Sequence, residues 1–127
     1  MYLYINTGSD RSKISLLNEN LQTISEQSLT EPRQQSEELL TAIDNLLKIN
    51  HVPKNVLKGI LVFRGPGSYT GLRVGIATAN ALSLAFNIKV WPVDNSVALD
   101  KKLLLNNNGG APVAPYYLKS PHITQPK

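Results

Sequence analysis

The sequence predicts an α/β domain in which helices pack on a mixed β-sheet. Short apolar or alternating segments bounded by turn residues indicate strands, and longer segments with apolar residues every three or four positions indicate helices. Along the chain these segments follow the order strand–strand–strand–helix–strand–helix–strand–helix, or βββαβαβα. The 127 residues are enough for one domain with its own hydrophobic core.

Three strands are predicted first, over residues 2–7, 13–17 and 21–29. In the first, large apolar residues alternate with tyrosines and an asparagine, so both faces are at least partly apolar. Turn-forming residues at 7–10 and 18–20 leave only short connections. Short connections favour antiparallel pairing between neighbouring strands.

A helix is predicted over residues 32–49. Thr30 can cap its amino end, and Glu31 and Pro32 suit its first turn, one by its charge and the other by its fixed φ. Pro53 ends the helical pattern because proline disfavours helical backbone at the preceding residue. The apolar face of this helix carries Leu39, Leu40, Ile43, Leu46 and Leu47.

The second half of the chain alternates strands and helices. The wholly apolar run at 59–63 predicts a central buried strand, and residues 89–93 predict another. Between them, a helix over 72–86 is apolar nearly all round, so we expect it to be buried on more than one side. Ser96 begins a third predicted helix, which continues into the leucines at 103–105.

The domain is predicted to end near residue 105. Residues 106–110 are Asn and Gly, which neither a helix nor a strand favours. Beyond them, prolines at four positions indicate an extended tail. We therefore expect residues 1–105 to form the domain and 106–127 to form a linker and a Pro-rich tail.

The composition argues against several classes of function. The chain has no cysteine, which excludes disulfide frameworks, thiolate metal sites and cysteine nucleophiles. His51 falls in a predicted loop and His122 in the tail, without the spacing of a metal-binding pair. No nucleophile–base pair is evident. We therefore expect no metal, no cofactor and no catalytic residues.

Hydropathy and charge indicate the cellular location and the class of binding partner. No apolar run is long enough to cross a membrane, and the amino terminus lacks the basic segment of a signal peptide. Together with the absence of cysteine, this leads us to expect a cytoplasmic location. The net charge of +4 comes from 13 Lys and Arg residues spread along the chain, a pattern that does not indicate direct binding of nucleic acid.

The loop between the buried strand and the second helix carries the one informative motif. A glycine loop that leads into a helix can hold an anion on its free backbone N–H groups. It can also be a tight turn in which a hydroxyl side chain caps the helix. The loop lacks the Lys-Ser/Thr ending of a P-loop, which favours the structural interpretation. Its residues are Gly65, Pro66, Gly67, Ser68, Tyr69, Thr70 and Gly71, with Arg73 nearby as a possible phosphate ligand.

Small residues recur every four positions along the second predicted helix. A stripe of this kind lets another element approach closely, either the sheet of the same domain or a partner helix. Because one sheet can cover only one side of a helix that is apolar all round, we favour the partner helix. The stripe consists of Gly71, Gly75, Ala79 and Ser83.

The same loop carries a family resemblance. The run Gly-Pro-Gly-Ser-Tyr-Thr-Gly-Leu-Arg-Val-Gly at 65–75 resembles the signature of the TsaB (YeaZ) family. TsaB is the dimerization subunit of the bacterial complex that makes threonylcarbamoyladenosine in tRNA. Residues 5–8 and 33–40 resemble two further family motifs, in the expected order. The resemblance extends over residues 1 to about 105.

This resemblance implies a fold, a partner and a role. The fold would be one lobe of the actin-like, Hsp70-like ATPase fold. Family members pair through their first two helices with TsaD, the catalytic subunit, which works with the ATPase TsaE. The implied role is a non-catalytic scaffold that binds a TsaD-like subunit, with TsaE as a further candidate partner and tRNA contacted indirectly. By resemblance and by the stripe, partner contacts would come from Ser36, Leu40, Ile43, Leu47, Gly71, Gly75, Ala79 and Ser83.

Three departures from the family pattern bear on the alternatives. Asn6 replaces the acidic residue that organises metal and phosphates in active members of this fold. Gln35 stands where the family commonly has His, and by the resemblance we expect this sequence to hold only one of the family's two lobes. Two other functions remain open. One is a nucleotide- or phosphate-binding module that uses the loop at 65–71, and the other is a homodimer formed through the helices at 32–49 and 72–86.

Overall fold

The computed structural model describes residues 1–8, 12–29, 36–66, 69–94 and Leu104. The elements follow the predicted order up to the fifth strand. They are β1 (Tyr2–Asn6), β2 (Lys13–Leu17), β3 (Thr23–Ser28), α1 (Ser36–Ile49), a 3₁₀ turn η1 (Lys54–Val56), β4 (Gly59–Gly65), α2 (Tyr69–Phe86) and β5 (Lys89–Asp94). The third helix predicted from Ser96, the domain end near 105 and the tail at 106–127 lie outside the described residues.

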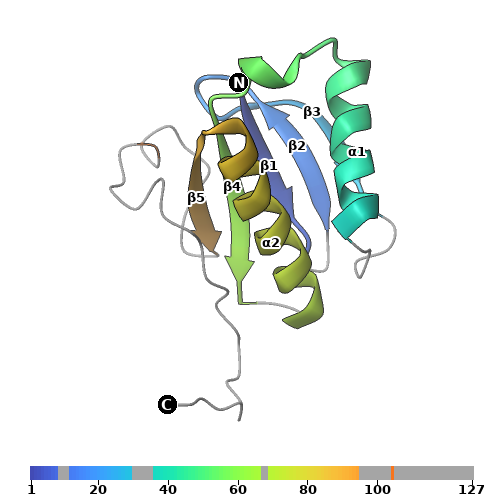
Figure 1. Cartoon of the computed structure of the whole chain (residues 1–127), viewed down its shortest axis with the longest axis vertical. Coiled ribbons are helices and arrows are strands. Elements are labelled where there is room, and N and C mark those ends of the chain that lie inside the picture. The colour runs from blue at the N-terminus through green and yellow to red at the C-terminus, as the bar shows by residue number, and fades with distance from the viewer. Residues whose placement is uncertain (9–11, 30–35, 67–68, 95–103, 105–127) are drawn as a thin grey trace.

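The five strands form one mixed sheet in the order β3-β2-β1-β4-β5. β1 pairs antiparallel with β2, and β2 with β3, as the short connections predict. β4 pairs parallel with both β1 and β5. The two helices lie on one face of the sheet, with α2 over β1 and β4 and α1 over β2 and β3 (Figure 1).

The main core lies between the sheet and the two helices. Successive strand residues point to opposite faces, so every second residue of a strand meets the helices. Ile5 lies directly beneath Gly75 of α2, which identifies the helix-facing set of β1. The strand register extends this set to Leu3, Ile5, Ile14, Leu16, Ile60 and Val62, all fully buried.

The opposite face of the sheet is also apolar. Leu61, Phe63, Trp91 and Val93 are buried there, and Tyr2 meets Trp91 edge to face with ring centroids 6.2 Å apart. β4 is therefore apolar on both faces, which confirms the central buried strand that the run at 59–63 predicts.

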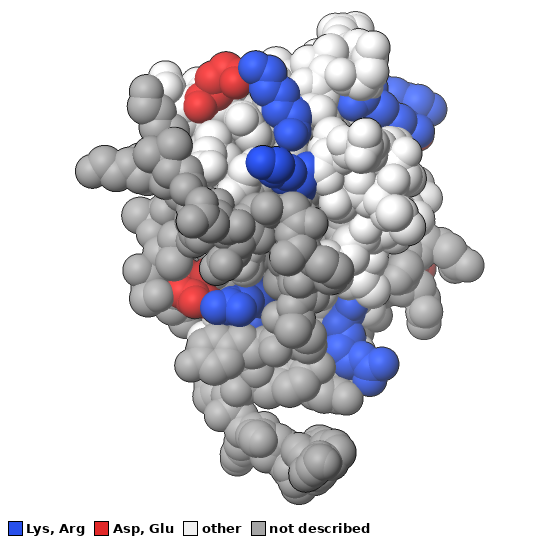
Figure 2. Space-filling model, turned by 60° about the vertical axis from the view of Figure 1, so that its left-hand side comes forward, with Lys and Arg blue, Asp and Glu red and all other residues white. Residues whose placement is uncertain are grey.

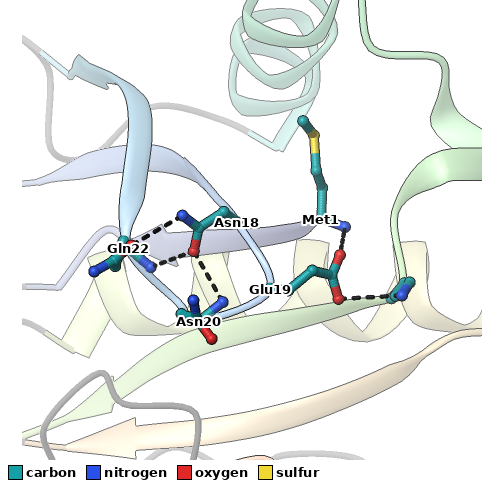
Figure 3. Close-up of polar contacts among 6 residues, drawn as sticks. Met1, Asn18, Glu19, Asn20 and Gln22 are labelled. Atoms are coloured by element: carbon teal, nitrogen blue, oxygen red, sulfur yellow. Dashed lines mark hydrogen bonds and ion pairs between the residues drawn. The ribbon is translucent and has the colours of Figure 1, made fainter.

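The turn between β2 and β3 is organised by Asn18 (Figure 3). Its side-chain oxygen accepts hydrogen bonds from the backbone N–H groups of Asn20 at 2.9 Å and Gln22 at 3.0 Å. The next residue, Glu19, accepts bonds from the Met1 amino group at 2.8 Å and from Lys58 Nζ at 3.1 Å. These contacts join the turn to the amino ends of β1 and β4.

Both helices end at a residue with left-handed backbone. His51 (φ 56°) follows α1 and Asn87 (φ 57°) follows α2. After α1, the N–H of Val52 bonds to the carbonyl of Leu47 and that of His51 to Lys48, the pattern of a Schellman cap. This cap, rather than Pro53 alone, ends α1 at Ile49.

At the amino ends of the helices, the prediction for α1 lies outside the described residues and the prediction for α2 is wrong. α1 is described from Ser36, and the predicted start at Thr30 to Pro32 lies outside the described ranges. α2 begins at Tyr69, three residues before the predicted start at Leu72, so the end of the glycine motif is already helical. Within the described parts of the chain, neither helix is long and apolar enough to cross a membrane.

Candidate functional site

The carboxyl end of β1 meets the first turn of α2 at a close backbone contact. The hydroxyl of Thr7 donates a buried hydrogen bond to the carbonyl oxygen of Gly71. A Cβ added at Gly71 would overlap the Thr7 carbonyl, and one added at Gly75 would overlap the Thr7 hydroxyl. Gly71 and Gly75 of the signature motif therefore allow α2 to pack closely against β1.

The signature loop itself leaves β4 through a backbone turn. Gly65 has φ 108°, a conformation that side-chain-bearing residues rarely adopt. Pro66 follows it, Tyr69 begins α2, and Thr70 and Arg73 are exposed on the first turns of the helix. Gly67 and Ser68, which an anion would contact in the phosphate-binding alternative, lie outside the described residues.

Asn6 is buried at the carboxyl end of β1, beside this contact. It forms a hydrogen bond with Tyr4, and its side-chain oxygen has no hydrogen-bond partner among the described residues. Burial raises the pKa of Tyr4 to about 12, although the hydrogen bond from Asn6 opposes this shift. A neutral amide cannot hold a metal–phosphate pair as a carboxylate does, which weakens the nucleotide-binding alternative at this position.

Several acidic residues in the described regions form ion pairs with basic ones. Arg64 Nη2 lies 3.7 Å from Asp94 Oδ2, and Lys13 Nζ lies 3.5 Å from Glu26 Oε1. Among these residues, no group of three His, Asp or Glu side chains could hold a metal ion. On the face drawn in Figure 2, the basic side chains lie in several separate places and do not form one patch.

The predicted stripe of small residues faces the chain's own sheet. Gly71 and Gly75 contact Thr7, and Ala79 is fully buried. Ser83 is half-buried and donates a hydrogen bond to the carbonyl of Ile88. The expectation that Gly71, Gly75 and Ala79 contact a partner helix is therefore corrected: all three are buried within the chain, and the two glycines let α2 lie close to β1. For Ser83 a partner contact stays a prediction.

A second series of small residues lies on the exposed side of α2. Ala77, Ala81 and Ala85 have the same four-residue spacing and are open to solvent. Leu84, beside them, is 85% exposed, the largest exposure among the large apolar side chains of the described residues. The side of α2 that is free to meet another protein is thus the side opposite the predicted one.

A groove of about 350 Å³ runs between α1 and α2. It brings together three of the residues predicted on α1: Ile43 and Leu47 are almost fully buried, and Leu40 is 41% exposed. Ser36 begins α1, and its side chain is not among those described. We call this the α1–α2 groove; its lining is Leu40, Thr41, Ile43, Asp44, Leu47, Lys54, Leu82 and Phe86.

Sequence reasoning missed the α2 side of this groove. Leu82 and Phe86 are four residues apart, so they share one helical face and could have been recognised as a pair. Asp44 and Lys54 come together only because η1 folds back beside α1, and no sequence pattern indicates that contact. The groove and the exposed side of α2 together form what we call the helical face.

The sequence of the chain is similar to proteins of known family. Residues 22–117 match the model of the TsaD family, tRNA N6-adenosine threonylcarbamoyltransferase. The chain is 42% identical over 50 residues to the tRNA threonylcarbamoyladenosine biosynthesis protein TsaB of Buchnera aphidicola. This alignment covers 39% of this chain and 23% of that protein. It is 28% identical over 97 residues to TsaB of Escherichia coli, covering 76% of this chain and 41% of that protein.

A solved structure shows the same fold. YeaZ from Pseudomonas aeruginosa superposes with a TM-score of 0.65 and 27% sequence identity, over 73% of this chain and 43% of that one. The predicted α/β lobe with a mixed sheet is confirmed by this likeness. The chain spans less than half the length of each of these relatives. By its family model the chain belongs to the TsaD family, and within that family its curated relatives and its fold group it with TsaB (YeaZ).

Proposed function

We propose that this chain is a non-catalytic subunit in the biosynthesis of threonylcarbamoyladenosine in tRNA, and that it binds a TsaD-type protein through its helical face. The observation that carries the proposal is the open apolar surface of α1 and α2. Leu84 is almost fully exposed, and the α1–α2 groove leaves Leu40 beside Leu82 and Phe86. Apolar surface of this kind on adjacent helices is typical of helix–helix association.

The size of the side chains on α2 suits a partner helix. Ala77, Ala81 and Ala85 offer no bulk along the exposed side, so a second helix can approach closely there. The groove beside them can accept larger side chains from that helix, because it is hollow and its floor is apolar. The row of exposed alanines beside the α1–α2 groove is therefore complementary in shape to an amphipathic helix.

The family match supports a TsaD-type partner. This chain matches the model of the TsaD family itself, so we expect a TsaD-type protein to share its fold and to carry an equivalent pair of helices. Proteins of one fold can pair through equivalent surfaces in a nearly two-fold arrangement, as homodimers do. The partner would supply the chemistry and the contact with tRNA, and a TsaE-type ATPase would join the complex through it.

The decisive experiment is calorimetric titration of this chain with the TsaD-type protein of the same organism. Ala81→Arg and Leu84→Glu should each weaken binding at least roughly tenfold, because they place charge in an apolar contact. Ile24→Glu is the matched control, since Ile24 is 46% exposed but lies on β3, outside the helical face. A wild-type chain that forms no complex at micromolar concentration, or a control that weakens binding equally, would refute the proposal.

Two further measurements test the alternatives. Sedimentation of the chain alone distinguishes a homodimer from a monomer, and Ala81→Arg should leave a monomer unchanged. Titration with ATP, ADP and magnesium tests the phosphate-binding alternative, and heat released on addition of nucleotide would favour it.

A further inference from the structure

A second hollow continues the α1–α2 groove towards η1. Its volume is about 290 Å³. Lys54 and Phe86 line both hollows, so the two are neighbours that share a wall. The second hollow is lined by Lys54, Asn55, Leu57, Phe86 and Ile88, which makes it apolar on one side and basic on the other.

Lys54 lines both hollows, and Asp44 of the groove lining forms ion pairs with Lys54 and with Lys48. Lys48 Nζ lies 3.0 Å from one oxygen of Asp44, and Lys54 Nζ lies 3.8 Å from the other. The hydrogen bond from Lys48, with the charges of both lysines, holds the pKa of Asp44 below its usual range. Two positive charges share one negative charge here, so this edge of the groove has an excess of positive charge.

The contacts of Asp44 are of a kind that a partner can replace. Both lysine side chains are more than half exposed, and exposed ion pairs contribute little to stability. A carboxylate brought in by a partner would meet the same lysines in a site that the partner shields from water, where the attraction is stronger. In the free chain, Asp44 thus binds the two lysines that a carboxylate of a partner protein would otherwise contact.

We propose that the partner segment seated in the α1–α2 groove is an amphipathic helix that carries an Asp or Glu at the end reaching Lys48 and Lys54. This inference rests on the proposed function and specifies the chemistry of the partner. The apolar floor made by Ile43, Leu47 and Leu82 favours a protein helix over nucleic acid, whose phosphates would gain nothing from it. The excess of positive charge selects the acidic end.

The experiment measures the affinity for the TsaD-type protein at low and high salt. The wild-type affinity should fall as salt rises, and the double variant Lys48→Gln/Lys54→Gln should bind roughly tenfold more weakly with a smaller salt dependence. Asp44→Asn should bind more tightly, because it removes the internal competitor for both lysines. Lys13→Gln is the control: Lys13 is also partly exposed and ion-paired, but with Glu26 on the sheet.

The outcomes separate this inference from the proposed function. If no complex forms, the proposed function fails. If a complex forms but its affinity is independent of salt and unchanged in Lys48→Gln/Lys54→Gln, only the acidic helix is refuted. Weaker binding by Asp44→Asn would also overturn it, since Asp44 would then contact the partner itself. Loss of affinity for a short RNA, but not for the protein, in the lysine variant would assign these lysines to nucleic acid instead.

Discussion

Thr7 and Gly71 are joined by a buried hydrogen bond from the threonine hydroxyl to the glycine carbonyl oxygen. The bond connects the carboxyl end of β1 to the first turn of α2. It depends on the missing side chain at Gly71, because a Cβ there would overlap the Thr7 carbonyl. A motif that resembles an anion-binding loop thus has a structural reason for its glycine at this position.

Gly71→Ala should destabilise the fold. In an unhindered helix, replacing Gly by Ala stabilises by about 1 kcal/mol. Here the new methyl group meets backbone, which cannot move aside as a side chain can, and overpacking of this kind costs about 1–3 kcal/mol. Urea unfolding should therefore show a lower free energy of unfolding than for the wild type. Ala81→Gly, at an exposed position of the same helix, calibrates the propensity effect; a stabilised Gly71→Ala would contradict the contact.

Thr7→Val tests the hydrogen bond without changing the shape of the side chain. Removing the hydroxyl from this buried pair should lower the free energy of unfolding by about 1 kcal/mol. Thr23→Val, on the exposed edge strand β3, makes the same chemical change where no burial is involved and should have little effect. Equal effects of the two substitutions in chemical denaturation would show that the Thr7 bond contributes nothing.

All five strands lie within two residues of their predicted bounds, for a local reason. β2 occupies the predicted positions 13–17, because its alternation and its flanking turn residues lie in one short stretch of sequence. The start of α2 could not be predicted in this way, since glycine disfavours helix and the motif resembles a turn. Its first turn is held by Thr7, which lies on another element, and such tertiary contacts override local propensity.

The candidate site was predicted less well, because periodicity shows which residues share a face but not what that face meets. Gly75 and Ala79 have the same spacing as Ala77 and Ala81, yet the first pair is buried and the second exposed. Leu40 belongs to the partner contacts that the family resemblance implies. Its neighbours across the groove became evident only when the structure brought α2 alongside α1.

His51→Gly should stabilise the chain. His51 holds a φ of 56° after α1, a conformation that costs a side-chain-bearing residue roughly 1–2 kcal/mol and glycine nothing. Glycine loses more backbone freedom on folding, roughly 0.5–1 kcal/mol, so the net gain should be about 0.5–1 kcal/mol. Thermal unfolding measures it. Asn50→Gly, one residue earlier, removes a side-chain hydrogen bond to Leu46 and should destabilise instead; a gain there too would point to a general effect of glycine.

Tyr4 should make the stability fall at high pH. Its pKa is raised to about 12 in the folded chain, against about 10 in an unfolded one. Between these values the unfolded chain loses the proton first, so the free energy of unfolding decreases as pH rises, by at most about 1.4 kcal/mol per pH unit. Below pH of about 10 this contribution is fully present. Absorbance titration should show one tyrosine ionising late, and Tyr4→Phe should abolish that step and flatten the pH dependence; an unchanged late step would assign it to another tyrosine.

Ala79→Arg and Ala81→Arg should separate folding from binding on one helix. Ala79 is fully buried against the sheet, so an arginine there would have to bury its charge or force α2 away, and we expect a loss of several kcal/mol or no folded protein. Ala81 is exposed, so the same change should alter the free energy of unfolding by no more than about 0.5 kcal/mol. It should nevertheless weaken binding to the TsaD-type protein at least roughly tenfold. Thermal unfolding and titration calorimetry on the two variants test both statements.

A folded Ala79→Arg that loses the partner, with Ala81→Arg still binding, would reverse the orientation of α2 described above. The side of α2 that meets the partner would then be the one we find against β1.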